Sequence, residues 1–167
     1  MNRTLKNVGI GVIGVFCLAL IAYLLVATVG PKNIQFDNNA TSMEPTIASG
    51  QVVTVAPYRH NTPQSSDIVE IKDPLNKNQH LISRIIGVPG DTVVIQNGTV
   101  TIHNKAAPNG YQPDKNLGLE VQTTGNFSVK LGPKQYYVLG DNRANSLDSR
   151  VFGPISSKDI VGKVIKY

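Results

Sequence analysis

The sequence contains one cysteine, no tryptophan and few other aromatic residues. The single cysteine, Cys17, lies within an apolar run, so no disulfide can form within the chain. The three histidines are isolated and lack the spacing of metal ligands, so we expect no metal and no other cofactor. The net charge is +5, but no block of Lys and Arg is interleaved with aromatic residues. The composition therefore argues against a nucleic-acid-binding protein.

One long apolar run is present near the N-terminus. Residues 8–29 are twenty-two residues without a formal charge. As a helix the run would be about 33 Å long, enough to span a hydrocarbon core of about 30 Å. Arg3 and Lys6 precede it, which predicts a single-pass membrane anchor with residues 1–7 in the cytoplasm. A cleaved signal peptide is the alternative, but its apolar region is usually shorter and ends at a small-x-small site.

The remainder of the chain, residues 30–167, predicts one extracytoplasmic all-β domain. Short apolar runs are separated by Gly and Pro, and Asn97-Gly98 between two β-branched runs is a strong hairpin signal. Residues 104–125 are polar and are expected to form a surface insertion with little core, and residues 140–153 a polar loop. The expected strands are residues 51–55, 67–72, 81–88, 92–96, 99–102, 127–131, 135–139 and 160–165.

A stiff serine-containing turn follows the apolar run, with the sequence Thr41-Ser42-Met43-Glu44-Pro45-Thr46-Ile47. Pro45 fixes its own φ, removes a backbone donor and biases Glu44 toward an extended conformation. Such a turn holds the Ser42 hydroxyl in one orientation, as a nucleophile requires. The alternative is an ordinary Ser-rich turn that leads into a strand. Ser42 follows the apolar run by only about thirteen residues, so the predicted anchor would keep it near the membrane surface.

Residues 140–150 combine two carboxylates, two guanidiniums and several hydroxyl and amide groups. Charge-assisted pairs between such groups can hold a loop rigid, whereas the simpler interpretation is a solvated charged turn. The residues concerned are Asp141, Asn142, Arg143, Asp148, Ser149 and Arg150.

Four separated segments together resemble the boxes of the bacterial type I signal peptidase family, also called leader peptidases. Residues 41–46 resemble the nucleophile box, 66–69 a shorter box, 83–91 the general-base box and 140–150 the last box. Their order and spacing behind a single anchor match this family of membrane-bound proteases. The resemblance implies a signal-peptidase-like β domain. It also implies that the substrates are signal peptides of secreted preproteins, cleaved after small-x-small residues.

The resemblance also assigns roles to individual residues. Ser42 would be the nucleophile, and Ser146 would hydrogen-bond the catalytic amine. Ala40 stands where some members carry an assisting hydroxyl, so an oxyanion hole would rest on backbone N–H groups, including that of Ser42. The substrate contacts would be Met43 and Pro45, and the supporting residues Asp141, Asn142, Arg143, Asp148 and Arg150.

The sequence departs from the family at the general base. The family's lysine directly precedes Arg84, and here that position is Ser83. A buried lysine with a depressed pKa can accept the nucleophile's proton, whereas a serine hydroxyl cannot. His80 is three positions away on the same predicted strand and so faces the opposite side. Lys72 on the neighbouring predicted strand, or a water relay, would be the other substitutes.

Three functional hypotheses follow. The first is a membrane-anchored serine endopeptidase that removes signal peptides, with Ser42 activated by a displaced base; the retained Ser42, Ser146 and Asp/Arg loop favour it. The second is a catalytically impaired homologue that acts as a peptide-binding or assembly factor, which Ser83 favours. The third is an autocleaving repressor-type protease with Ser-Lys chemistry. The predicted anchor and the lack of a DNA-binding segment argue against this third hypothesis.

Overall fold

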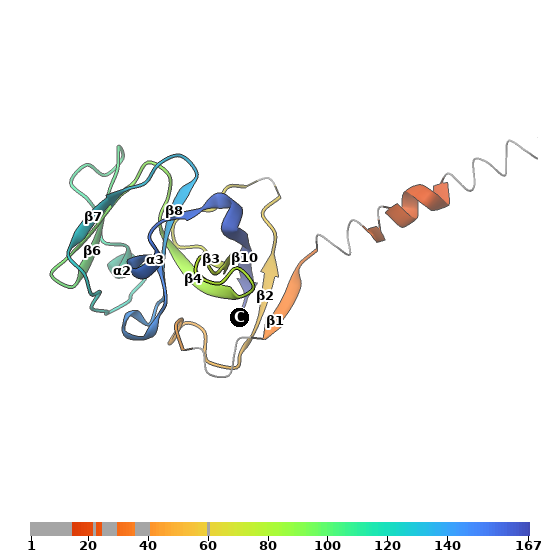
Figure 1. Cartoon of the computed structure of the whole chain (residues 1–167), viewed down its shortest axis with the longest axis horizontal. Helices are drawn as coiled ribbons and strands as arrows, with labels where there is room; N and C mark the ends of the chain where they lie inside the picture. The colour runs from red at the N-terminus through yellow and green to blue at the C-terminus, as the bar shows by residue number, and fades with distance from the viewer. Residues whose placement is uncertain (1–14, 22, 25–29, 36–40, 60) are drawn as a thin grey trace, which may run out of the picture. The chain divides into compact units, whose positions relative to one another are not determined.

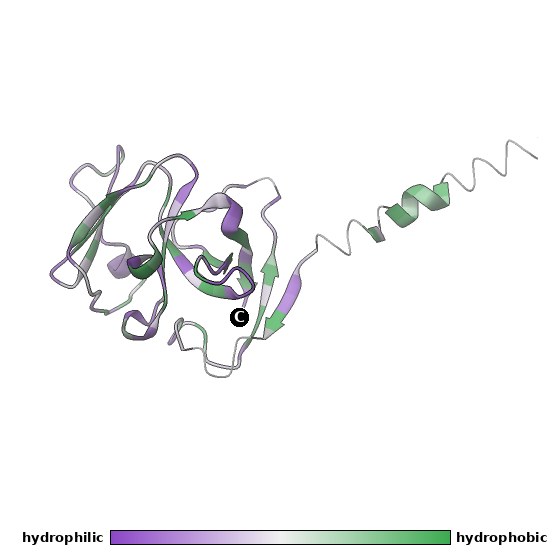
Figure 2. Cartoon of the chain, in the orientation of Figure 1, coloured by the Kyte–Doolittle hydropathy of each residue, from purple (hydrophilic) through white to green (hydrophobic). Residues whose placement is uncertain are grey.

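The computed structural model describes residues 15–21, 23–24, 30–35, 41–59 and 61–167. The chain divides into two compact units, Met1–Pro31 and Lys32–Tyr167. In the first unit, residues 15–21 and 23–24 are helical and exposed, and the helix is apolar (Figure 2). Within the described residues, no helix is long and apolar enough to cross a membrane. The anchor predicted at residues 8–29 lies only partly within the described residues, and residues 1–7 lie outside them.

The second unit is mostly β, as predicted, and contains two antiparallel sheets. The large sheet has the strand order β1-β2-β10-β3-β4-β8-β9, and the small sheet has the order β6-β5-β7. Figure 1 shows β6 and β7 at one end of this unit and β2 and β10 at the other. The strands are β1 (Lys32–Gln35), β2 (Val52–Ala56), β3 (Ile68–Lys72), β4 (His80–Gly87), β5 (Thr92–Gln96), β6 (Thr99–His103), β7 (Phe127–Lys130), β8 (Gln135–Leu139), β9 (Ile155–Ser156) and β10 (Ile160–Lys166).

The eight predicted strands are all present, with ends that differ from the prediction by at most one residue. The predicted hairpin is confirmed: β5 pairs with β6 in register from Thr92↔His103 to Gln96↔Thr99. Asn97 and Gly98 form its turn with φ angles of 49° and 79°. These left-handed values suit a two-residue hairpin, whose twist matches that of the flanking strands. Two short strands, β1 and β9, were not predicted.

The β3–β4 pair is the centre of the large sheet, and apolar clusters cover both of its faces. On one face, Ile68 and Ile82 pack with Met43 and Ile47 from the serine-containing turn. On the other face, a second cluster contains Val69, Ile71, Ile85, Tyr136, Val138 and Ile155. Alternate side chains of a strand point to opposite faces, so both residue sets of β3 and β4 are buried. The serine-containing turn is thereby fixed against the central strands.

The segment at residues 104–125 was expected to have little core, and that prediction was wrong in part. It contains helix α2 (Pro113–Asn116) and a bridge between Tyr111 and Ile102 of β6. Asp114 and Thr123 are buried, because both contact a buried arginine of the 140–150 segment. That segment is likewise more than a polar loop, since it holds the 3-10 helix η1 (Arg143–Asn145) and helix α3 (Ser149–Phe152). A second 3-10 helix, η2 (Ser157–Asp159), precedes β10.

Candidate active site

The serine-containing turn is held from beneath by two buried side chains. Met43 and Ile47 are each 0% exposed, while Ser42 above them is partly exposed. Within the turn, the Glu44 N–H donates to the Thr41 carbonyl at 3.2 Å and the Ile47 N–H to the Met43 carbonyl at 3.0 Å. Pro45 is exposed. Met43 thus belongs to the core in this structure, and the substrate contacts expected of Met43 and Pro45 stay predictions.

The 140–150 segment forms hydrogen bonds with both ends of this turn. The Asn142 N–H donates to the Ser42 carbonyl at 2.9 Å, and Asn142 Nδ2 donates to the Thr41 carbonyl at 3.1 Å. At the other end, Thr46 Oγ1 donates to Asp141 Oδ2 at 2.5 Å. A fourth hydrogen bond runs from Asn145 Nδ2 to Thr41 Oγ1, so four hydrogen bonds join residues about a hundred positions apart in the chain. This fixes the backbone on which the Ser42 hydroxyl is carried.

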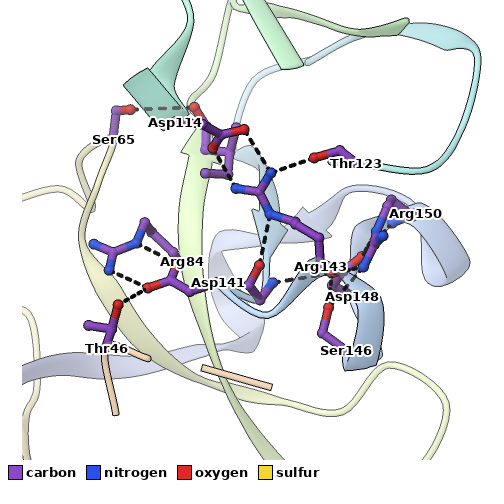
Figure 3. A network of polar contacts seen from close by, with 12 residues as sticks. Thr46, Ser65, Arg84, Asp114, Thr123, Asp141, Arg143, Ser146, Asp148 and Arg150 are labelled. Carbon is purple, nitrogen blue, oxygen red and sulfur yellow. Dashed lines mark hydrogen bonds and ion pairs between the residues drawn. The ribbon is translucent and has the colours of Figure 1, made fainter. Parts of the chain in front are cut away.

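A buried ion pair connects the same segment to β4. Arg84 Nε and Nη2 donate to the two oxygens of Asp141 at 2.8 and 2.6 Å, and the Asp141 side chain is 0% exposed. Arg84 Nη1 also donates to the Ser66 carbonyl at 3.0 Å. Figure 3 shows Thr46 and Arg84 meeting on Asp141. Parts of all four sequence boxes thus meet around one carboxylate, through pairs that reach outside the 140–150 segment.

The neighbouring Asp67 is held by a similar set of donors. Burial alone would raise the pKa of its carboxyl, but hydrogen bonds from Lys163, Tyr58 and the Gln64 N–H outweigh burial and keep that pKa below its usual value. Asp67 is therefore ionised at neutral pH. It fixes the backbone beside Ser66, whose carbonyl orients Arg84.

Ser146 lies in a second polar cluster with Asp148 and Arg150. The Ser146 hydroxyl donates to Asp148 Oδ2 and accepts from Arg150 Nη2 at 2.9 Å. Arg150 also holds both oxygens of Asp148 at 2.8 Å. A hydroxyl oxygen has two lone pairs, so Ser146 can still accept one further hydrogen bond. The cluster therefore offers an oriented acceptor to an amine.

Gly140 joins the two parts of the site. A Cβ placed on Gly140 would lie 2.6 Å from the Ser42 carbonyl oxygen and 2.4 Å from Ser146 Cβ. The Ser42 backbone and the Ser146 side chain therefore both lie too close to this residue to leave room for a side chain. No larger residue fits here without moving one of the two serines.

Gly140→Ala is expected to lower the free energy of unfolding by about 1–3 kcal/mol, because its Cβ overlaps backbone as well as side-chain atoms. Urea denaturation of the purified chain measures the change. The matched control is Gly132→Ala, whose Cβ would meet only the flexible end of Gln135, at 3.0 Å. Equal stability of the two variants would contradict the crowding described for Gly140.

Ser83 is buried on β4, opposite Val69 of β3. In the same register Lys72 lies opposite His80, three positions from Ser83, and the side chains of Lys72 and His80 therefore lie on the other face of the pair. His80 Nδ1 contacts buried Glu70 at 2.5 Å, and Lys32 Nζ also bridges Glu70. Within the described part of the chain, Ser42 Oγ has no hydrogen bond to a lysine or histidine side chain. The register thus does not supply a substitute amine at the Ser83 position.

Several residues of the site were not singled out from the sequence. Thr46 and Arg84 lie inside recognised boxes, and their contacts with Asp141 follow from the fold. Asp114 and Thr123 lie in the polar insertion, where the sequence gives no signal of a buried role. Among the described residues, no group of three or more His, Cys, Asp or Glu side chains could hold a metal ion. What the site can offer chemically is one oriented hydroxyl, a second hydroxyl as acceptor, and a rigid polar scaffold.

Comparison with known proteins identifies related chains. A family model described as "Signal peptidase, peptidase S26" matches residues 9–167. Signal peptidase I V of Bacillus subtilis (strain 168) is 36% identical over 141 residues, which cover 78% of this chain and 83% of the relative. Signal peptidase IB of Staphylococcus aureus (strain COL) is 33% identical over 162 residues, with coverages of 86% and 82%. A crystal structure of a signal peptidase I from Enterococcus faecalis V583 matches with a TM-score of 0.49 at 28% identity, over 62% of this chain and 97% of that chain.

Proposed function

Because the chain belongs to the signal peptidase family, peptidase S26, as its sequence boxes predicted, we propose that it is a membrane-anchored serine endopeptidase that removes signal peptides from exported preproteins. Ser42 is its nucleophile. Residues 8–29 are its anchor, residues 1–7 lie in the cytoplasm, and residues 30–167 act outside it at the membrane surface. The observation that carries the proposal is the attachment of the Ser42 turn to the 140–150 segment.

An open strand edge supports binding of an extended peptide. β4 pairs with β3 along residues 80–84, but it pairs with β8 only from Arg84 onward. Within the described strands, residues 80–83 therefore have a sheet partner on one side only. An extended substrate can add to such an edge through main-chain hydrogen bonds. Ile82 on this edge packs in the same apolar cluster as Met43, next to the nucleophile.

The lack of a base beside Ser42 leads us to expect a low kcat. When Ser42 Oγ attacks the scissile carbonyl, its proton must pass to a base. The buried Ser83 hydroxyl can relay a proton but cannot hold it. His80 is paired with Glu70, and among the described residues no lysine or histidine side chain is hydrogen-bonded to Ser42 Oγ. Water is then the acceptor. We expect cleavage that is slow but dependent on Ser42.

A second candidate function is signal-peptide binding without turnover, as a binding or assembly factor. The presence of Ser83 at the position of the family's lysine favours it. The open edge of β4 would serve this function equally well, because it needs no chemistry at Ser42.

One experiment separates the two functions. The full-length chain in detergent is incubated with a preprotein that carries a small-x-small site, beside Ser42→Ala and the exposed control Ser128→Ala. We expect slow cleavage at one bond by the wild type and Ser128→Ala, and none by Ser42→Ala. Equal cleavage by all three proteins would remove Ser42 from the mechanism. Preprotein binding without cleavage by any of them would establish the second function.

A further inference from the structure

We propose that Asp114, in the segment between the recognised boxes, is a positioning residue for the cleavage reaction and acts through Arg143. The proposal rests on the proposed function, because positioning matters only if Ser42 reacts. It adds a residue of the polar insertion to the active site, although nothing in the local sequence of that insertion indicates a role.

The guanidinium of Arg143 is enclosed, with a side chain that is 1% exposed. Its Nη1 and Nη2 donate to the two oxygens of Asp114 at 2.8 and 2.5 Å, and Nη1 also donates to Thr123 Oγ1 at 2.6 Å (Figure 3). Among the described residues, Asp114 is the one carboxylate paired with Arg143. A buried guanidinium needs such a counter-charge, because removal of one partner leaves the other charge desolvated and unpaired.

Arg143, held in place by Asp114, in turn fixes the backbone of Gly140. Its Nε donates to the Gly140 carbonyl at 2.8 Å, and the Gly140 N–H donates to Asp148 Oδ2 at 3.1 Å. Both polar groups of Gly140 are therefore held by side chains. A Cβ on Gly140 would overlap the Ser42 carbonyl oxygen and Ser146, so both groups lie close to this residue. Two residues later, the Asn142 N–H donates to the Ser42 carbonyl.

Loss of the Asp114 charge should therefore act on the reaction rather than on substrate binding. An unpaired Arg143 would turn toward solvent and release the Gly140 carbonyl. Gly140 would then keep only the hydrogen bond from its N–H to Asp148 Oδ2 and lose the one from Arg143 Nε to its carbonyl. The open edge of β4, where the substrate is proposed to pair, has no contact with Asp114 or Thr123 among the interactions of the described residues.

The test compares four full-length proteins in detergent: wild type, Asp114→Asn, Asp114→Glu and Glu120→Gln. Glu120 is an exposed carboxylate of the same segment, so its variant matches the charge change. Preprotein cleavage gives kcat and KM, and hydrogen exchange is followed at the Asn142 amide and at the amides of β3. Where wild-type turnover is too slow to divide into kcat and KM, the same variants are made in a Ser83→Lys background.

In Asp114→Asn we expect kcat to fall about 10- to 100-fold, with KM changed by less than about twofold, because a small misplacement of reacting groups is enough for such a loss. Exchange at the Asn142 amide should rise by about tenfold while that of β3 is unchanged. Asp114→Glu should recover part of kcat, and Glu120→Gln should match the wild type.

The proposal is overturned if Asp114→Asn has the same kcat and the same Asn142 amide exchange rate as the wild type. It is also overturned if amide exchange becomes faster evenly over the whole domain. Absence of cleavage in every variant and in both backgrounds counts against the proposed function instead. In that case exchange at the Asn142 amide, which needs no turnover, decides only whether Asp114 holds the backbone beside Ser42.

Discussion

Ser83→Lys is expected to raise kcat/KM for preprotein cleavage by about 10²- to 10⁴-fold, the usual contribution of a positioned general base. Position 83 is buried on β4, which depresses the pKa of an amine placed there and keeps part of it neutral near pH 7. The neighbouring Arg84 is fixed by Asp141, which is tied to the Ser42 turn. Ser146 retains a lone pair for the new amine.

The measurement is a pH profile of kcat/KM for Ser83→Lys, which should rise as the amine loses its proton. Ser83→Met is the matched control, because it adds a chain of similar length without an amine. Thermal unfolding of both variants shows whether the added atoms disturb β4. A folded Ser83→Lys protein that cleaves no faster than Ser83→Met would show that more than the amine is missing. The Ser42→Ala/Ser83→Lys double variant should be inactive.

Asp141→Ala is expected to lower the free energy of unfolding by about 3–5 kcal/mol, because Arg84 would be left buried without its counter-ion. The variant also removes the acceptor of Thr46 and so frees one end of the serine-containing turn. Since domains of this size are stable by only about 5–15 kcal/mol, such a loss is measurable by urea denaturation and leaves little reserve.

Two further proteins complete this experiment. Glu120→Ala removes an exposed carboxylate and should change the free energy of unfolding by less than about 0.5 kcal/mol. Arg84→Met/Asp141→Leu removes both charges together and should cost less than Asp141→Ala, because no buried charge is left unpaired. A loss below about 1 kcal/mol in Asp141→Ala would mean that the Arg84–Asp141 contact does not hold the site together.

The strands of the second unit could be predicted from the sequence because their signals are local. Alternating β-branched residues and the Asn97-Gly98 turn define β5 and β6 without reference to the rest of the chain. The same holds for β2, β3, β4, β7, β8 and β10. Two short strands were not predicted. β1 has four residues and β9 has two, too few to show an alternation of apolar and polar residues. Their formation depends on the edges of β2 and β8.

By itself the sequence determined the family, through the residues and spacing of its boxes. That Ser83 takes the place of the family's lysine stays a prediction. Only the tertiary structure decided which side chains meet. Ion pairs such as Arg84–Asp141 and Arg143–Asp114 join residues 57 and 29 positions apart, and Lys72 could be placed only from the register of β3 with β4. Such contacts depend on how strands and loops pack across the whole domain, and no local pattern encodes them. For this reason the role of Ser42 stays a prediction from the sequence, and the fold shows the contacts that hold its turn.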